Sequence, residues 1–315
     1  NQLTAQSSAL TLLIYQLTVA ASLIVSAWLF QQHNISAAVF VMLVFCVLAV
    51  FELVLPLSAA MQMLAKTQAS AQRIRHIVEQ KPLIAEPVNP QKIINTGAIR
   101  IKNLSFRYTE QSDWVLKNIQ LDIPQGSKTA IIGESGAGKS TLLQLILRFY
   151  DAQQGSIEYS GIDYKKITSN NLMEQFAVLS QRTELFAATI KQNLLIAKPK
   201  ASNSEIDQAI QQAGLDKFIK QLPEGLNTWI GEHGSKVSGG EARRIALARM
   251  YLKDAPILLL DEPTEGLDQA TENDVLATLE QIAKHKTLVM VTHRKAGLKL
   301  VDRVFKLGQG QLFRI

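Results

Sequence analysis

The sequence predicts an α/β domain that follows an all-α helical hairpin within one chain of 315 residues. Three observations support this division. No Asp, Glu, Lys or Arg occurs before Glu52, and this uncharged part consists of two long apolar stretches. A proline-containing segment follows, with Pro82, Pro87 and Pro90. From about Ile99, short apolar runs alternate with helix-forming segments, as in α/β domains with a largely parallel sheet.

The two apolar stretches cover residues 9–30 and 36–57, and the short segment QQHNI separates them. Each stretch has about 22 residues, which at about 1.5 Å per helical residue spans a hydrocarbon layer of about 30 Å. A soluble core helix would need polar side chains on its exposed face, and these stretches lack charge altogether. We therefore expect a hairpin of two transmembrane helices.

The residues after the hairpin indicate its orientation. The second stretch is followed by four basic residues, Lys66, Arg73, Arg75 and Lys81. The connecting loop has no Lys or Arg, so the loop should face outward and the rest of the chain the cytoplasm. Residues 58–80 lack Pro and Gly, which predicts that the second helix continues beyond the membrane. We expect residues 1–80 to be the C-terminal part of a transmembrane domain and 81–98 to be a linker.

The chain begins at Asn1 without Met and without the features of a signal peptide, which indicates a piece of a longer polypeptide. Cys46 is the one cysteine, so a disulfide framework or a cysteine metal site within this chain is excluded. The formal charge of +6 is spread over scattered Lys and Arg without an aromatic-interleaved basic stripe. This pattern argues against nucleic acid as a partner.

The segment GESGAGKST at 133–141 satisfies the phosphate-loop pattern G-x-x-x-x-G-K-[ST]. KTAII before it is expected to be a strand and TLLQLILRF after it a helix, which is the context that the motif requires. Backbone N–H groups of such a loop surround phosphate, the lysine reaches the β- and γ-oxygens, and Ser140 ligates Mg²⁺. The loop residues expected to bind ATP are Gly133, Glu134, Ser135, Gly136, Ala137, Gly138, Lys139, Ser140 and Thr141.

Downstream, ILLLDEPT predicts a buried strand that ends in Asp261 and Glu262. Ligands of open α/β sheets bind at the carboxyl ends of the strands, so two carboxylates there indicate a site. We expect Asp261 to hold Mg²⁺ through water and Glu262 to polarise the attacking water.

These segments, together with VSGGE at 237–241 and His293, resemble the ATPase domain of ABC transporters in order and spacing over about residues 99–315. The resemblance implies an ABC-type P-loop ATPase fold with a helical subdomain, and ATP and Mg²⁺ as cofactors. It also implies a signature loop that acts in trans, on ATP held by a partner chain. Two helix N-termini from two chains would then neutralise one triphosphate. The signature residues are Ser238, Gly239, Gly240 and Glu241.

Four further positions take roles from the same resemblance. Tyr108 in SFRY matches the aromatic that stacks on adenine, and Gln181 in VLSQ matches the Q-loop residue that touches Mg²⁺. Asp268 in EGLD matches the D-loop, which crosses to the other chain. His293 in VTHR would contact the γ-phosphate and act in catalysis with Glu262. The sequence departs from the common pattern at Val237 and Glu241, where Leu and Gln are usual, and in EGLD, where SALD is usual; neither departure removes a phosphate ligand.

Membrane helices ahead of the ATPase on one chain are typical of ABC exporters, which carry six helices per half. Within this class, DEPTEGLD, FELVLPLSAAMQMLAKTQASAQRI and THRKAGLKLVDR resemble CydC-type subunits of the bacterial thiol-reductant exporter. That resemblance implies a heterodimer with a CydD-like partner, in contact with membrane lipid, in the bacterial inner membrane. The expected activity is export of glutathione or cysteine to the periplasm in support of cytochrome bd assembly. An exporter of lipid, peptide or drug with the same architecture is the alternative.

Glu52 is the one ionised group in the membrane stretches. Such a carboxylate is costly in lipid and normally faces a cavity or a partner. It is either a structural pair with a basic residue on another helix or a contact for the amine of a thiol substrate. Haem ligation by His33 or His76 is disfavoured because no CxxCH occurs. A clamp acting on nucleic acid or ribosomes is disfavoured by the hairpin, and a half-transporter that binds ATP without cleaving it is disfavoured by Glu262.

Overall fold

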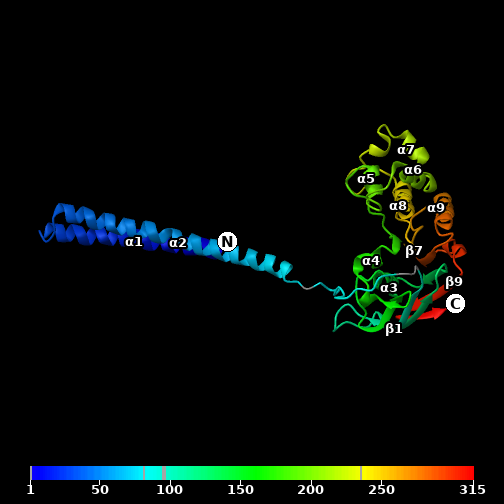
Figure 1. Cartoon of the computed structure of the whole chain (residues 1–315). Helices are drawn as coiled ribbons and strands as arrows, with labels where there is room; N and C mark the ends of the chain where they lie inside the picture. Colours follow the sequence, from blue (N-terminus) through cyan, green and yellow to red (C-terminus); the bar gives the residue numbers. More distant parts are fainter. Residues whose placement is uncertain (1, 81, 94–96, 235) are drawn as a thin grey trace. The chain divides into compact units, whose positions relative to one another are not determined.

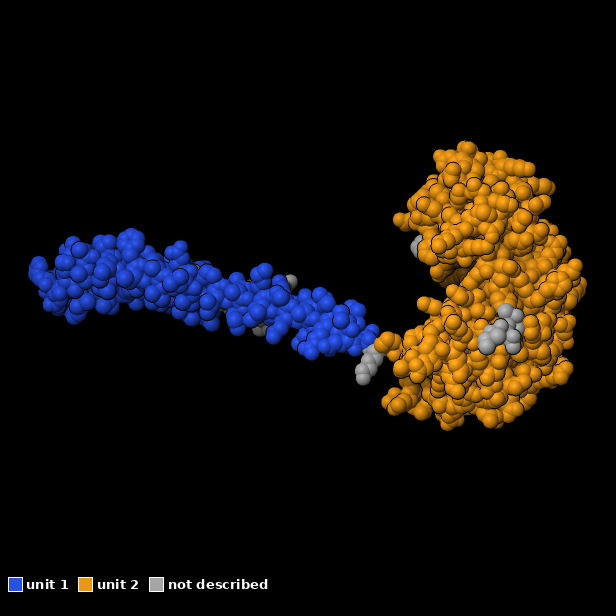
Figure 2. Space-filling model, viewed as in Figure 1, with its two compact units in different colours: residues 1–81 blue, residues 82–315 orange. Residues whose placement is uncertain are grey.

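The computed structural model describes residues 2–80, 82–93, 97–234 and 236–315. It separates into two compact units, residues 1–81 and residues 82–315, which are coloured separately in Figure 2.

The first unit is a helical hairpin of α1 (Gln2–Gln31) and α2 (Ala37–Val78). The Ser36 hydroxyl accepts a hydrogen bond from the Val39 N–H and so caps α2. The two helices lie side by side (Figure 1), and the rings of Tyr15 and Phe51 pack edge to face at 5.0 Å between centroids. Within the described residues, both helices are long and apolar enough to cross a membrane by length and composition.

The second unit contains two sheets. The larger has the strand order β10-β9-β3-β8-β7-β6, and all its strands are parallel except β10. The smaller is antiparallel, with the order β2-β1-β4-β5. The strands are β1 (Ile99–Phe106), β2 (Leu116–Ile123), β3 (Lys128–Ile132), β4 (Gln154–Tyr159), β5 (Ile162–Asp163), β6 (Phe176–Leu179), β7 (Ile257–Asp261), β8 (Thr287–Val291), β9 (Arg303–Gly308) and β10 (Gln311–Arg314).

The antiparallel sheet refines the prediction of one largely parallel sheet. Between β1 and β2 the chain runs only from residue 107 to 115, with no helix there. A parallel pair needs a crossover connection of a dozen or more residues, so these two strands must pair antiparallel. The parallel sheet therefore begins only at β3.

The remaining helices of the second unit are α3 (Lys139–Ile146), α4 (Ser169–Met173), α5 (Ile190–Leu195), α6 (Asn203–Gln212), α7 (Asp216–Gln221), α8 (Gly239–Lys253) and α9 (Gln269–Ile282). Helices α5 to α8 gather at one end of the unit and form the helical subdomain (Figure 1). Short 3₁₀ turns occur at Tyr164–Lys166, Gly225–Asn227, Glu232–Gly234 and Gly297–Leu300.

The large sheet lies between two hydrophobic cores. Alternate residues of β7 point to opposite faces: Ile257 and Leu259 join the core with α3, whereas Leu258 and Leu260 join the core of the helical subdomain. This double burial explains why the strand is continuously apolar. Because β3, β8 and β7 are neighbours, the segments that follow their carboxyl ends converge at one edge of the sheet.

Candidate functional site

The phosphate loop connects β3 to α3, and two of its glycines are required by the fold. A Cβ on Gly133 would lie 2.3 Å from the Leu307 carbonyl oxygen of β9. Gly138 has a φ of 98° and caps α3 in the left-handed region, which favours glycine. The Lys139 Nζ donates hydrogen bonds to the carbonyls of Gly133 and Glu134, each at 2.8 Å. The ammonium thus stands at the loop, with a third donor for a phosphate oxygen.

A cavity of about 630 Å³ opens beside this loop. Twelve predicted site residues line it: Tyr108, Gly133, Ser135, Gly136, Gly138, Lys139, Ser140, Thr141, Gln181, Asp261, Glu262 and His293. Val115 and Glu265 line it as well. Glu134 and Ala137 instead line a neighbouring cavity of about 890 Å³, bounded by residues 113–115, Lys117 and the β9–β10 hairpin. The charged and titratable groups Lys139, Asp261, Glu262 and His293 therefore all line the smaller cavity.

Asp261 ends β7, where burial and then the neighbouring Glu262 raise the pKa of its carboxyl, against the opposing charge of Lys139. A cation beside Asp261 would offset both effects. Ser140, Gln181 and Asp261 line the same cavity and offer hydroxyl, amide and carboxylate oxygens. Magnesium prefers such oxygen ligands and usually shares its coordination with substrate phosphates and water, so this donor set fits Mg²⁺.

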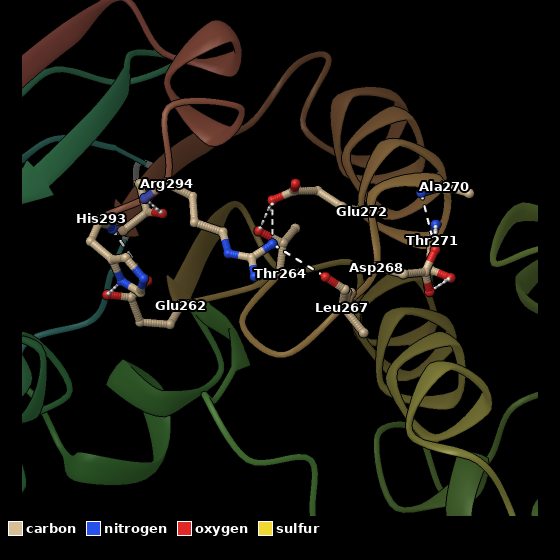
Figure 3. Close-up of polar contacts among 10 residues, drawn as sticks. Glu262, Thr264, Leu267, Asp268, Ala270, Thr271, Glu272, His293 and Arg294 are labelled. Carbon is tan, nitrogen blue, oxygen red and sulfur yellow. Dashed lines mark hydrogen bonds and ion pairs between the residues drawn. The ribbon is translucent and has the colours of Figure 1, made fainter.

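Glu262 and His293, both expected from the sequence to act in catalysis, are in direct contact, which the sequence did not predict (Figure 3). The Nδ1 of His293 lies 2.9 Å from Glu262 Oε1, and the His293 backbone N–H donates to Glu262 Oε2 at 3.3 Å. The Glu262 N–H in turn donates to the Val291 carbonyl at the end of β8. Glu262 has a φ of 48°, a strained conformation for a residue with a Cβ and one that clusters at functional sites.

Tyr108 follows β1 and lies at the mouth of the cavity with half of its surface exposed. Its ring packs edge to face against Phe106 and Tyr150, at 5.1 and 5.4 Å between centroids. Its hydroxyl lies 2.9 Å from Thr141 Oγ1 and donates to Gln144 Oε1 at 3.1 Å. These contacts hold the ring in place, and half of the residue's surface stays exposed beside the cavity.

The signature residues form the N-terminus of α8, outside this cavity. Ser238 caps the helix, and a capping box joins it to Glu241: the Ser238 N–H and Oγ donate to Glu241 Oε2 at 2.7 and 2.8 Å. A Cβ on Gly239 would meet nothing within 4 Å, and one on Gly240 would meet only Thr271 Cγ2 at 3.6 Å. Neither glycine has a positive φ. Within the described part of the chain, the fold therefore does not demand glycine at either position.

Asp268 also lies outside the cavity, at the start of α9 and away from the Glu262–His293 pair (Figure 3). Its carboxylate accepts hydrogen bonds from the N–H groups of Ala270 and Thr271, each at 3.0 Å. The Thr271 hydrogen bonds hold the pKa of this carboxyl below its usual range. Asp268 thus has a local structural role as a helix cap.

Two residues in contact with Gln181, Arg243 and Glu265, were not predicted from the sequence as part of the site. The buried Arg243 of α8 donates to the carbonyls of Ser180 and Gln181 at 2.7 and 2.8 Å. The Gln181 amide donates to Glu265, a residue of EGLD. This contact uses the amide nitrogen, so the amide oxygen is the atom that Mg²⁺ would take. The one sequence signal for Glu265 was that EGLD stands where SALD is usual. This departure adds a third carboxylate to the cavity, beside those of Asp261 and Glu262.

Glu52 lies within α2 of the other unit, four residues before Pro56, and its side chain is exposed. Among the described residues it forms no ion pair. His33 stands in the turn after α1 and His76 near the end of α2, both exposed.

A phosphate loop, a carboxylate pair after a buried strand and a helical subdomain define a P-loop nucleotide-binding domain. Comparison with known proteins gives the family: residues 116–265 match the ABC transporter model. The chain is 39% identical to the glutathione/L-cysteine transport system ATP-binding/permease protein CydC of Escherichia coli over 312 residues, 99% of this chain and 54% of that protein. It is 42% identical to the protein of the same name from Haemophilus influenzae over 283 residues, 90% of this chain and 49% of that protein.

Other relatives include an ATP-dependent lipid A-core flippase of Chromohalobacter salexigens, 33% identical over 95% of this chain and 52% of that protein. A solved bacterial Atm1-family ABC exporter with ATP bound is 30% identical, with a TM-score of 0.79 over 98% of this chain and 54% of that one. The chain spans about half the length of the curated relatives it matches. It belongs to the ABC transporter family and carries that family's ATP-binding domain.

Proposed function

We propose that this chain is the ATP-hydrolysing part of a membrane exporter subunit. The observation that carries the proposal is the cavity that brings the phosphate loop, Asp261 and the Glu262–His293 pair together. Each group suits one part of the cleavage of ATP between its β- and γ-phosphates. Lys139 and the loop N–H groups bind the triphosphate, and Tyr108 stacks on adenine.

Glu262 accepts a proton from the attacking water, and His293 sets the orientation of that carboxylate. The contact between Nδ1 of His293 and Oε1 of Glu262 is short, whereas from the described residues Oε2 receives the longer 3.3 Å bond of the His293 backbone N–H alone. Oε2 is thus the better acceptor for a water proton. Ser140, Gln181 and Asp261 would hold Mg²⁺, which would supply positive charge against that of the triphosphate.

The signature residues act on ATP held by a partner half-transporter. Glycine is less favourable than alanine in a helix, by up to about 1 kcal/mol in the interior. Among the residues that the structure describes, none crowds Gly239 or Gly240 in a way that would explain this cost. Close approach of a ligand from outside explains both glycines, and a γ-phosphate suits the exposed N-terminus of α8. Glu241 would have to release Ser238, whose N–H and hydroxyl it binds.

The transported solute is a small thiol, glutathione or cysteine, exported across the bacterial inner membrane in support of cytochrome bd assembly. The 39% and 42% identities to proteins named for glutathione and L-cysteine transport support this choice. The two apolar helices α1 and α2 support a membrane location, with the ATPase domain in the cytoplasm. The partner is a second half-transporter of CydD type, and Glu52 is a candidate contact for the thiol's amine.

A lipid exporter is the second candidate, because lipid A-core flippases share 33% identity with this chain. The two candidates are separated by reconstituting the full-length protein with its partner in vesicles and measuring ATP hydrolysis. Glutathione or cysteine should raise the rate, whereas lipid A should leave it unchanged. Stimulation by lipid A alone would overturn the thiol assignment.

A further inference from the structure

The buried carboxylate of Glu272 lies outside the ATP cavity and contacts the two segments that carry Glu262 and His293. Glu272, on the first turn of α9, is 5% exposed. The Thr264 hydroxyl donates to its Oε1 at 2.7 Å, and Arg294 Nη1 donates to the same oxygen at 3.0 Å. The Thr264 hydrogen bond, followed by that of Arg294, holds the pKa of Glu272 below its usual range. Glu272 is therefore a buried anion with two specific donors.

The two donors flank the pair at the site. Thr264 comes two residues after Glu262, and Arg294 comes directly after His293. In Figure 3 the Glu272 carboxylate lies next to the side chains of both Thr264 and Arg294, and the Glu262–His293 contact lies on the other side of Arg294. Glu272 Oε1 thus joins the segment that carries Glu262 to the segment that carries His293. These segments follow β7 and β8, and 31 residues separate Glu262 from His293 along the chain.

Arg294 makes a further contact to the segment before α9. Its Nη1 also donates to the Leu267 carbonyl at 3.4 Å, one residue before Asp268. Thr264 is 1% exposed, and the Arg294 side chain is 30% exposed. Burial lowers the local dielectric and makes these bonds stronger and more restrictive than exposed ones. The arrangement fixes the spacing of three segments: after β7, after β8 and before α9.

We propose that Glu272 is a positioning residue for ATP hydrolysis, which sets the separation and orientation of Glu262 and His293 through Thr264 and Arg294. The inference rests on the proposed function, because it assumes that Glu262 activates water. Glu272 contacts no reacting atom; its effect passes entirely through the two flanking residues. Misplacing a general base by about 1 Å can cost about 100-fold in rate without weakening substrate binding.

The test compares variants of the full-length protein assembled with its partner. Glu272→Ala should lower kcat about 10-fold to 100-fold and leave the KM for ATP within about twofold. Glu272→Gln keeps an acceptor oxygen for Thr264 but loses the charge that faces Arg294, so it should recover part of the rate. The matched control is Asp274→Asn, which removes an acid on the same helix that binds Arg244 at 2.9 Å. This control should keep kcat within about twofold, because exposed ion pairs contribute little.

A double-mutant cycle separates positioning from a merely structural role. In a His293→Ala background, Glu272→Ala should cost less than about threefold in kcat, because the pair it positions is already broken. Full additivity of the two losses would overturn the proposal. Should Glu272→Ala fail to assemble, the same cycle is run with Glu272→Gln, and the same criterion decides.

The failure of this inference is distinct from failure of the proposed function. Wild-type kcat in the Glu272 variants, together with loss of hydrolysis in Glu262→Gln, would overturn the positioning role alone. Wild-type hydrolysis in Glu262→Gln would instead overturn the proposed function on which it rests.

Discussion

Gly133→Ala tests whether the phosphate loop depends on its close approach to β9. The new Cβ would lie 2.3 Å from the Leu307 carbonyl oxygen, whereas ordinary contact begins at 3.4 Å. One of the two must therefore move by about 1.1 Å, the difference between these distances. Leu307 is 1% exposed, pairs with Leu312 of β10 and follows Lys306, which pairs with Ile132 of β3. Strand β9 is thus paired on both sides, with β10 and with β3, so we expect the loop to move instead.

Overpacking of this kind costs about 1–3 kcal/mol. If the phosphate-binding geometry of the loop bears that cost, the affinity for ATP falls about 5-fold to 150-fold. Calorimetric titration of ATP into the assembled full-length protein measures the loss, and thermal unfolding shows whether the domain stays folded.

The matched control for this substitution is Gly308→Ala. It adds the same methyl group one residue after Leu307, where a Cβ meets nothing within 4 Å. The control should bind ATP within about twofold of the wild type, as expected for a surface change. Wild-type affinity in Gly133→Ala, or an equal loss in Gly308→Ala, would refute the reasoning.

Two further predictions concern adenine binding and pH. Tyr108→Ala should lower ATP affinity about 5-fold to 150-fold, because an aromatic stack contributes about 1–3 kcal/mol per base. Tyr108→Phe keeps the ring, so its affinity for ATP should stay within about threefold of the wild type. Equal losses in calorimetric titrations of both variants would contradict stacking. Hydrogen bonding from Thr264 holds the pKa of Glu272 below its usual range in the folded state. Its contribution to the free energy of unfolding is therefore fully present above the pKa of the unfolded state and is lost as pH falls through the folded pKa. Denaturant titrations should therefore show a steeper acid loss for the wild type than for Glu272→Gln, and equal slopes would contradict the assignment.

The sequence predicted the parts of the site that follow strands but not the contacts between them. Gly133, Lys139 and Asp261 sit in motifs with fixed spacing, so residue type and order were sufficient to predict that they lie together at the carboxyl edge of the sheet. The Glu262–His293 contact depends on β7 and β8 being neighbours in the sheet, and strand order is not written in local patterns.

Buried charge was the other feature that residue type concealed. Arg243 and Glu272 are 5% exposed, although Arg and Glu are usually found at the surface. Hydrogen-bond partners that are distant in the sequence compensate for this burial. Arg243 donates to the backbone carbonyls of Ser180 and Gln181. Glu272 accepts from Thr264 and Arg294. The antiparallel pairing of β1 and β2 was likewise not predicted from the sequence. The connection between these strands is too short for a parallel crossover, which explains the pairing.

The most direct test of hydrolysis at this chain's own site is Glu262→Gln in the assembled full-length transporter. Azido-ATP labelled on its γ-phosphate is photo-crosslinked after incubation, the two subunits are separated, and the label on this chain is counted. The wild-type chain should lose the γ-label as it hydrolyses the nucleotide. Glu262→Gln should bind equally but retain the label, with hydrolysis slowed at least about 100-fold. Loss of the label from Glu262→Gln at the wild-type rate would contradict the assignment of Glu262 as the base.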